Sequence, residues 1–229
     1  MRVEIWSDVI CPWCYIGKRR FETALEGFEA RDDVEVVFRP YQLDPTASPG
    51  KAMPVREAYA RKFGGWERAD EIMAHLTGVA AQSGIEFHLE KAQRANTLLA
   101  HRLLWLAEHE GDQAGLKERL LQAYFIDGEN VGDPDTLARL ALDAGLPAES
   151  VRNVLEGDAG LAEVREQLEQ AQAMGITAVP TYVFDGRWTV PGAQDPEVFV
   201  AVLNRVRTLE AEEVAARAAD ACRDESCAV

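Results

Sequence analysis

The sequence predicts an α/β fold in which a large all-helical insertion interrupts a small sheet-containing domain. Near its start the chain shows a strand pattern, a helix pattern and a second strand pattern, in that order. After a loop at residues 44–54, apolar residues recur at helical spacing almost throughout residues 55–174, and glycines end most of these stretches. Beyond residue 176 two short strand patterns flank a hairpin signal, and a helix pattern follows. We therefore expect a sheet domain, residues 1–48 and 176–229, and a helical domain, residues 49–175.

The first element is a strand at residues 2–6, where polar and apolar side chains alternate. A helix pattern follows over residues 17–29. Pro12 suits the first helical position, because the N–H of that residue has no partner within a helix. Residues 34–38 predict the second strand. Since a helix connects the two strands, they should be parallel and joined by a right-handed crossover.

The insertion reads as a series of helices with recognisable ends. Asp133 ahead of Pro134 is typical of a helix start, and Asn96 is expected to cap an earlier helix. The expected helices cover residues 55–63, 67–82, 96–109, 113–126, 133–145, 147–155 and 161–174. The histidines are scattered, and we expect each to be a packing or surface residue: His75, His88, His101 and His109.

The sheet resumes at residues 177–184. Asp185-Gly186 is a two-residue hairpin signal, and residues 187–190 return as the partner strand. Asp195-Pro196 then starts the last helix, with the aspartate as its cap. The order strand, helix, strand, insertion, hairpin, helix is that of a thioredoxin-like fold.

The segment Cys11-Pro12-Trp13-Cys14 lies where the first strand passes into the first helix. Residues three apart at a helix start have Cα atoms about 5 Å apart, within the roughly 4.4–6.8 Å that a disulfide tolerates. Cys11 lies nearest the unpaired N–H groups and the positive end of the helix dipole, which favour thiolate over thiol. We predict that Cys11 is the nucleophile of thiol-disulfide exchange and that Cys14 resolves the mixed disulfide.

Proline at position 180 is the second informative residue. Proline removes a donor from the hydrogen-bond ladder and is excluded from central strands, so its place near a strand start needs an explanation. In a thioredoxin-like fold this strand runs beside the one that leads to the cysteines. We predict a cis Val179–Pro180 bond, which presents the Val179 backbone opposite Cys11. An ordinary proline of an edge strand is the alternative.

A second cysteine pair, Cys222 and Cys227, follows a charged helix pattern at residues 210–221. Residues five apart in a continuous helix lie about 8–9 Å apart, beyond the roughly 7 Å limit for a disulfide. Pairing therefore requires the helix to unwind near Asp224. Our hypothesis is a second redox pair that exchanges with Cys11 and Cys14 or with a partner protein, and incidental exposed cysteines are the alternative.

Zinc binding stays open as a different class of function. The two cysteine pairs have two and four intervening residues, spacings that zinc tolerates, so a zinc-binding redox-sensing module is an alternative. Two structural cysteines are a further interpretation of the first pair. Zinc knuckles usually carry turn-forming residues between their ligands, whereas Pro12-Trp13 starts a helix. We therefore expect no metal.

The charge balance limits the partners. The chain has 24 Lys and Arg against 39 Asp and Glu, a formal net charge of −15. This argues against nucleic acids and anionic membranes, which select basic surfaces. No apolar run approaches the 18 residues or more of a membrane span, and no signal-peptide pattern precedes the first strand. We expect a cytoplasmic protein. The oligomeric state stays open.

Several separated motifs together carry a family resemblance. They are residues 6–17, Asn96-Thr97 with Ala100-His101, residues 123–128, and residues 179–186. The sequence resembles the DsbA-like thioredoxin superfamily, and within it the FrnE-type cytoplasmic oxidoreductases, from about residue 2 to residue 209. The resemblance implies a redox pair at Cys11 and Cys14, and a helical insertion that covers the active site. The residues that it implies for shaping the site are Pro12, Trp13, Asn96, Val179 and the cis-proline Pro180.

The resemblance also implies partners and an activity. The partners would be proteins with disulfides or small thiols, with glutathione or another thiol donor as reductant and no bound cofactor. Secreted DsbA-type oxidants carry histidine where Trp13 stands, so this protein should be less oxidising, a reductase or isomerase. The same superfamily contains glutathione-dependent hydroxychromene-carboxylate isomerases and kappa-class glutathione transferases. These typically have serine at the first cysteine position and lack the second, so Cys11 and Cys14 count against this alternative.

Overall fold

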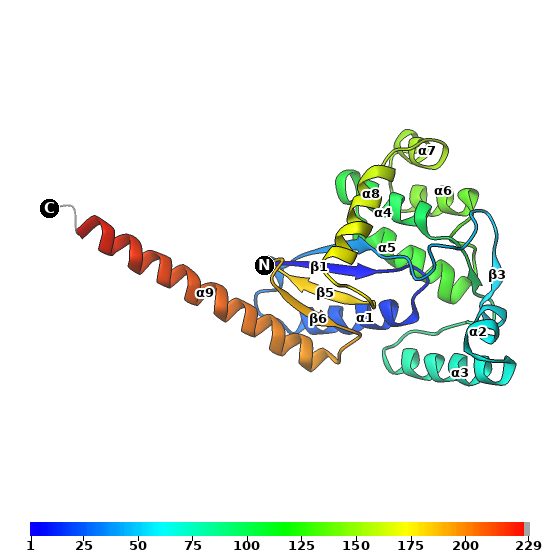
Figure 1. Ribbon diagram of the computed structural model, residues 1–229, viewed down its shortest axis with the longest axis horizontal. Helices are drawn as coiled ribbons and strands as arrows, with labels where there is room; N and C mark the ends of the chain where they lie inside the picture. The colour runs from blue at the N-terminus through cyan, green and yellow to red at the C-terminus, as the bar shows by residue number, and fades with distance from the viewer. Residues whose placement is uncertain (227–229) are drawn as a thin grey trace.

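The sheet at the centre of the protein has the order β2-β1-β5-β6. The computed structural model describes residues 1–226, with side chains to Arg217 (Figure 1). The strands are β1 (Arg2–Ser7), β2 (Glu35–Pro40), β5 (Thr181–Phe184) and β6 (Trp188–Pro191). The β1 and β2 strands are parallel, whereas β5 pairs antiparallel with both β1 and β6. The predicted strand–helix–strand unit and the predicted hairpin are confirmed.

The sequence predicted the hairpin turn correctly but placed the start of strand β5 too early. Asp185 and Gly186 have φ of 48° and 67°, as the two central residues of a tight hairpin require. The Val179–Pro180 peptide bond is cis, as predicted. The strand itself was predicted to begin at residue 177 but begins at Thr181. Pro180 has no N–H for the ladder, so regular pairing starts only after it.

One face of the sheet is covered by two helices, α1 (Pro12–Glu26) and α9 (Pro196–Ser226). Phe21 of α1 and Phe199 of α9 are buried with Tyr182 and Phe184 of β5 in one apolar cluster. The first helix begins at Pro12, as predicted, and ends at Glu26, three residues before the end of the helix pattern at residue 29.

The last helix is continuous from residue 196 to residue 226 and extends far beyond the sheet (Figure 1). The two helix patterns recognised in the sequence, before and after residue 210, are therefore one helix. Cys222 lies on this helix, but its side chain is outside the described part of the structure, as is the whole of Cys227. The predicted second redox pair thus falls outside the described residues and stays a prediction.

The insertion is helical, as predicted, apart from two short paired strands, β3 (Met53–Pro54) and β4 (Gln93–Arg94). Its helices are α2 (Val55–Phe63), α3 (Trp66–Gln82), α4 (Leu98–Glu110), α5 (Gln113–Gln122), α6 (Pro134–Asp143), α7 (Ala148–Glu156) and α8 (Leu161–Ala173). The stretch after α5 departs from expectation: Ala123–Asp127 forms a π-helical turn. A short 3₁₀ turn, Arg31–Asp33, lies before β2.

The largest apolar cluster joins the insertion to the start of α1. Val9, Ile10, Tyr15 and Ile16 are buried in it together with side chains of α3 to α7. The segment that carries the two cysteines is therefore fixed from both sides, by the sheet behind it and by the helices in front. No helix among residues 1–226 combines the length and the apolar character that a bilayer crossing needs.

Candidate active site

Cys11 lies directly before helix α1, four residues after the end of strand β1. It is the N-cap of α1, with an extended backbone (φ −89°, ψ 115°), and Pro12 occupies the first turn. The N–H groups of Cys14 and Tyr15 donate to the Cys11 carbonyl oxygen at 3.0 and 3.3 Å. The Cys11 side chain therefore lies at the end of the helix where N–H groups are unpaired and the dipole is positive.

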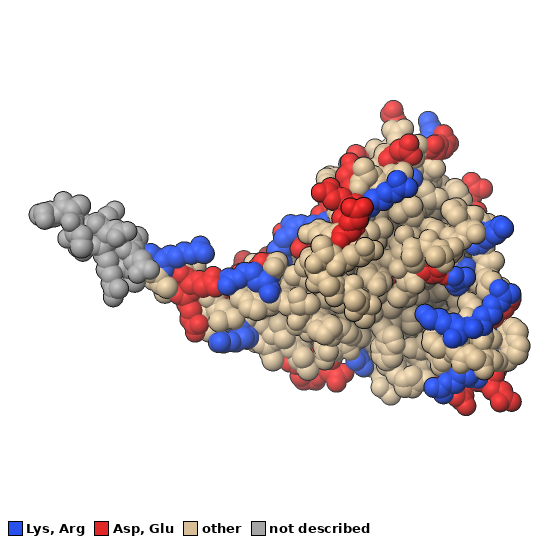
Figure 2. All heavy atoms as spheres, viewed as in Figure 1, with Lys and Arg blue, Asp and Glu red and all other residues tan. Residues whose placement is uncertain are grey.

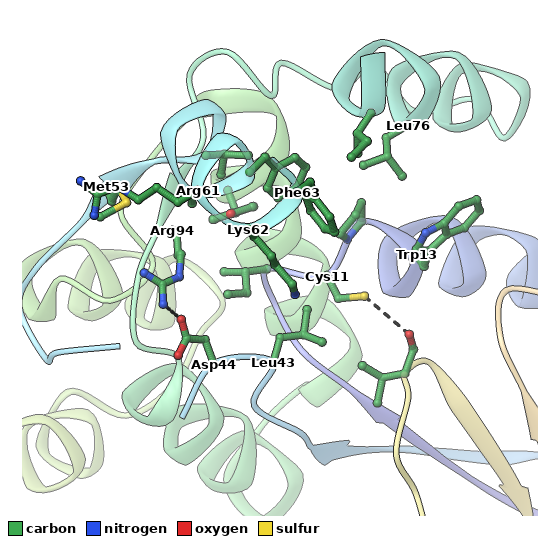
Figure 3. A pocket seen from close by; sticks show the side chains of 18 of the residues that line it. Cys11, Trp13, Leu43, Asp44, Met53, Arg61, Lys62, Phe63, Leu76 and Arg94 are labelled. Carbon is green, nitrogen blue, oxygen red and sulfur yellow. Dashed lines mark hydrogen bonds and ion pairs between the residues drawn. The ribbon is translucent and has the colours of Figure 1, made fainter. Parts of the chain in front are cut away.

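Across from Cys11 lies the segment before β5. The Cys11 thiol donates to the carbonyl oxygen of Val179, with 3.7 Å between Sγ and oxygen (Figure 3). Val179 is joined to Pro180 by the cis peptide bond. The structure therefore brings together Cys11, Val179 and Pro180, as the sequence predicted.

Cys14 lies one helical turn further along α1, and both cysteines are 3% exposed. Neither Cys14 nor Cys11 forms a disulfide in this structure. Burial raises the pKa of Cys14 well above its ordinary value, and the hydrogen bond and charge of Cys11 raise it further. Cys11 lines the cavity described next and Cys14 does not. This difference in access favours Cys11 as the thiol that a substrate meets.

A cavity of about 850 Å³ opens over Cys11 between α2, α3 and the loop after β2 (Figure 3). Its wall also includes Trp13, which is 38% exposed and packs against the His75 ring with 6.4 Å between centroids. Burial raises the pKa of Tyr59 to about 12, so its hydroxyl stays protonated there at neutral pH. Apolar side chains make up much of the remaining wall: Ile10, Leu43, Met53, Val55, Ala58, Phe63, Ile72, Leu76 and Val179.

Beneath the cysteines lies a charged side chain that the sequence analysis missed. Lys117 of α5 is 1% exposed, and its Nζ has no hydrogen-bond partner among the described residues. Burial lowers the pKa of Lys117 to about 8, while the negative charge that Cys14, Asp8 and Cys11 can carry opposes this lowering. The sequence holds one signal for it: Lys117 precedes Leu120 and Leu121 at helical spacing, on the buried face of α5.

Asp8 is a second buried charge, three residues before Cys11. Its two carboxylate oxygens accept the N–H groups of Val9 and Leu43, each at 2.8 Å. His101 Nε2 lies 3.2 Å from Asp8 Oδ1 and 3.0 Å from the carbonyl oxygen of Tyr41. Asp8 therefore holds the loop that carries Leu43 against the segment just before Cys11. Leu43 lines the cavity. His101 is a packing residue, as expected, but its ring is also a polar link in this cluster.

Asn96 does not line the cavity. Its Nδ2 donates to the carbonyl oxygen of Ala47 at 2.8 Å, and its Oδ1 accepts from the N–H of Leu98 at 2.9 Å. The expected role as cap of α4 is wrong by one residue, because Thr97 occupies that position. Asn96 instead steadies the loop behind the cavity wall, since Asp44 and Thr46 of that loop do line it.

Metal binding finds no support in the described part of the chain. Among those side chains no three His, Cys, Asp or Glu residues gather in a way that would hold a metal ion. The zinc alternative also includes Cys222 and Cys227, whose side chains lie outside the described part of the structure, so it stays a prediction.

Comparison with known proteins gives consistent results. Residues 2–204 match the profile of the DSBA-like thioredoxin domain. The protein YwbO of Bacillus subtilis (strain 168), described as uncharacterized, is 32% identical over 200 residues, which cover 87% of this chain and 94% of YwbO. The crystal structure of the probable DsbA oxidoreductase SCO1869 from Streptomyces coelicolor has a TM-score of 0.84 and 41% identity, covering 90% of this chain and 89% of that one. The cytosolic disulfide reductase DsbM from Pseudomonas aeruginosa shares the fold, with a TM-score of 0.62, 17% identity, and coverage of 91% and 100%.

Proposed function

Because the chain belongs to the DSBA-like thioredoxin domain family, a family of disulfide chemistry, we propose that it is a thiol-disulfide oxidoreductase in which Cys11 attacks the substrate disulfide. One observation carries the assignment of roles. Cys11 lies at the start of α1, lines the cavity and contacts the Val179 carbonyl, whereas Cys14, which is equally buried, does not line the cavity.

In the first step the Cys11 thiolate attacks one sulfur of a disulfide R–S–S–R′. The S–S bond of the substrate breaks, a Cys11–S–S–R bond forms, and R′S⁻ leaves and takes up a proton. The N–H groups at the start of α1 stabilise the negative charge on Cys11 before the attack. The Val179 backbone beside Cys11 offers a carbonyl acceptor to the substrate chain.

In the second step Cys14 loses its proton and attacks the Cys11 sulfur. The mixed disulfide breaks, RS⁻ leaves, and the Cys11–Cys14 disulfide forms, so two electrons have passed from the protein to the substrate. Deprotonation of Cys14 is opposed by its burial, and the positive charge of Lys117 counteracts this. A thiol donor such as glutathione then reduces the protein disulfide again.

The direction and the subgroup are part of the proposal. Trp13 stands between the cysteines, and its indole packs against His75 and carries no charge of its own. A less stabilised thiolate makes the disulfide less oxidising, which supports a reductase or isomerase of the FrnE type. A cytoplasmic location agrees with this direction, and DsbM, which shares the fold, is described as cytosolic.

The test is the reduction of insulin disulfides with a thiol donor present. The wild-type protein should accelerate the reduction, and Cys11→Ser should not accelerate it at all. Cys14→Ser should lose most of the turnover, because the mixed disulfide cannot be resolved internally. A parallel assay of glutathione conjugation addresses the alternative of an isomerase or transferase. If that activity is present and survives in Cys14→Ser while insulin reduction is absent, the proposed function is wrong.

A further inference from the structure

The cavity over Cys11 carries charge of the opposite sign to the protein as a whole. The chain has a formal net charge of −15. The charged side chains that line the cavity are nevertheless mostly basic. Three are cationic, Arg61, Lys62 and Arg94, and one is acidic, Asp44. Figure 2 shows several Lys and Arg side chains at the end of the molecule where Figure 1 places α2 and β3.

Two of these cations are already neutralised. Arg94 forms an ion pair with Asp44 across the cavity wall. Arg61 pairs with Glu57, one turn earlier on α2, at 2.5 Å. Such pairs leave little net charge for a ligand to meet.

Lys62 is the exception. Within the described residues no carboxylate lies within 4.0 Å of its Nζ, which rests 5.4 Å from the centre of the Phe63 ring. Lys62 and Cys11 line the same cavity, and Figure 3 shows the lysine side chain extending from α2 toward the side of Cys11. A substrate held at Cys11 therefore meets one positive charge without a counter-ion, on an exposed side chain beside the apolar residues of the cavity.

We propose that the cavity selects disulfides that carry an apolar group next to a carboxylate, and that Lys62 pairs with this carboxylate. The inference rests on the proposed function, since it assumes that the substrate sulfur is held at Cys11. The apolar body of the substrate packs against Leu43, Met53 and Phe63, and the carboxylate lies at Lys62. The exchange itself is unchanged: the substrate S–S bond breaks and the Cys11–Cys14 disulfide forms.

Lys62 matters because the rest of the protein repels such a substrate. A net negative protein and a negatively charged Cys11 thiolate both oppose the approach of an anion. A cation beside the thiolate offsets this locally. At about 4 Å in water one ion pair changes a rate or binding constant by about fivefold, and added salt reduces the effect.

The experiment measures rates of reaction of the reduced protein with three small disulfides of different charge. The protein carries Cys222→Ser and Cys227→Ser, so that only Cys11 and Cys14 react. The probes are 5,5′-dithiobis(2-nitrobenzoate), which is aromatic and anionic, 4,4′-dithiodipyridine, which is aromatic and neutral, and cystamine, which is cationic. Lys62→Gln and Lys62→Glu are compared with Lys51→Gln, which removes an exposed lysine outside the cavity lining.

Lys62→Gln should slow the anionic probe about fivefold at low salt and leave the neutral probe unchanged. Lys62→Glu should slow the anionic probe more and accelerate cystamine, and 0.5 M salt should shrink both effects. Lys51→Gln should change none of the rates by as much as twofold. Equal effects of Lys62→Gln on all three probes, or none on the anionic one, would overturn the inference. The proposed function fails separately, if Cys11→Ser reacts with the neutral probe as fast as the parent protein.

Discussion

The Sγ atom of Cys11 lies 3.7 Å from the carbonyl oxygen of Val179, although 168 positions separate the two residues in the chain. The contact depends on the antiparallel pairing of β1 with β5, in which Trp6 lies opposite Thr181. It also depends on the close packing of α1 against Pro180. This packing is possible because Gly17 of α1 has no side chain. Substitutions at this contact between α1 and the segment before β5 can therefore test the packing directly.

The first prediction concerns Gly17. A Cβ atom at this position would lie 2.7 Å from the Tyr182 hydroxyl and 3.0 Å from Cγ of Pro180. We expect Gly17→Ala to lower the free energy of unfolding by about 1–3 kcal/mol, because α1 must move away from Pro180. Urea unfolding measures the change. The matched control is Gly78→Ala in α3, where a Cβ meets no atom within 4 Å.

Gly78→Ala should stabilise the protein by roughly 0.5–1 kcal/mol, the usual gain in a helix interior. Equal stabilisation by both substitutions would show that α1 and Pro180 are not tightly packed.

The second prediction concerns Asp8, whose carboxylate accepts two backbone N–H groups and lies beside His101. Asp8→Ala leaves these buried donors without an acceptor, so we expect a loss of about 3 kcal/mol in the free energy of unfolding. Asp32→Ala, at a side chain that is 95% exposed, should change it by less than about 0.5 kcal/mol. If the two variants unfold at the same urea concentration, the buried cluster contributes no stability.

The third prediction is a pH dependence caused by Lys117. Its pKa is about 8 in the folded protein and 10.5 when unperturbed, so between these values the unfolded chain binds the proton that the folded protein has lost. Stability from this group therefore rises with pH from about 8 to 10.5, by about 3 kcal/mol in total. Lys117→Met should remove this rise. Urea unfolding across this range, with all four cysteines replaced by serine, measures it without thiol titration. Because Cys11 and Cys14 oppose the lowering of the Lys117 pKa, the rise should be at least as large in this background.

Parallel pH profiles for the lysine and methionine proteins would contradict the assignment, because they would mean that Lys117 titrates alike in both states.

The fourth prediction concerns the second step of exchange. Lys117 lowers the pKa of Cys14 by its charge, against the stronger raising effect of burial. Lys117→Met should therefore slow the release of the second thiol about tenfold or more near neutral pH, and leave the first release much less changed. Rapid-mixing absorbance with 4,4′-dithiodipyridine, in the Cys222→Ser/Cys227→Ser background, resolves the two releases. Equal slowing of both would indicate a general structural effect instead.

The sequence predicted those parts of the fold that local chemistry determines. Pro12 after Cys11 marked the helix start, and Asp185-Gly186 marked the hairpin, because each residue restricts its own backbone. Alternation and helical spacing located most elements of both domains. The strand before the hairpin was predicted too long, since apolar spacing alone does not show that Pro180 cannot join the ladder.

The candidate site was predicted only in part, for a physical reason. Cys11 and Cys14 are neighbours in the chain, and Pro180 has a local signature. Lys117, in contrast, reaches the dithiol from α5, and no spacing in the sequence specifies which helix packs there. Asp8 and His101 meet in the same way, 93 positions apart. Partners that depend on tertiary packing need the structure.

The most direct test of the account is to trap the mixed disulfide and locate it. In the Cys222→Ser/Cys227→Ser background, Cys14→Ser should form a one-to-one mixed disulfide with a small disulfide probe, and peptide mass spectrometry should place it on Cys11. Cys11→Ser should form the adduct far more slowly, because Cys14 does not line the cavity and burial raises its pKa. If Cys11→Ser forms the adduct as fast as Cys14→Ser, Cys11 is not the residue that attacks the substrate.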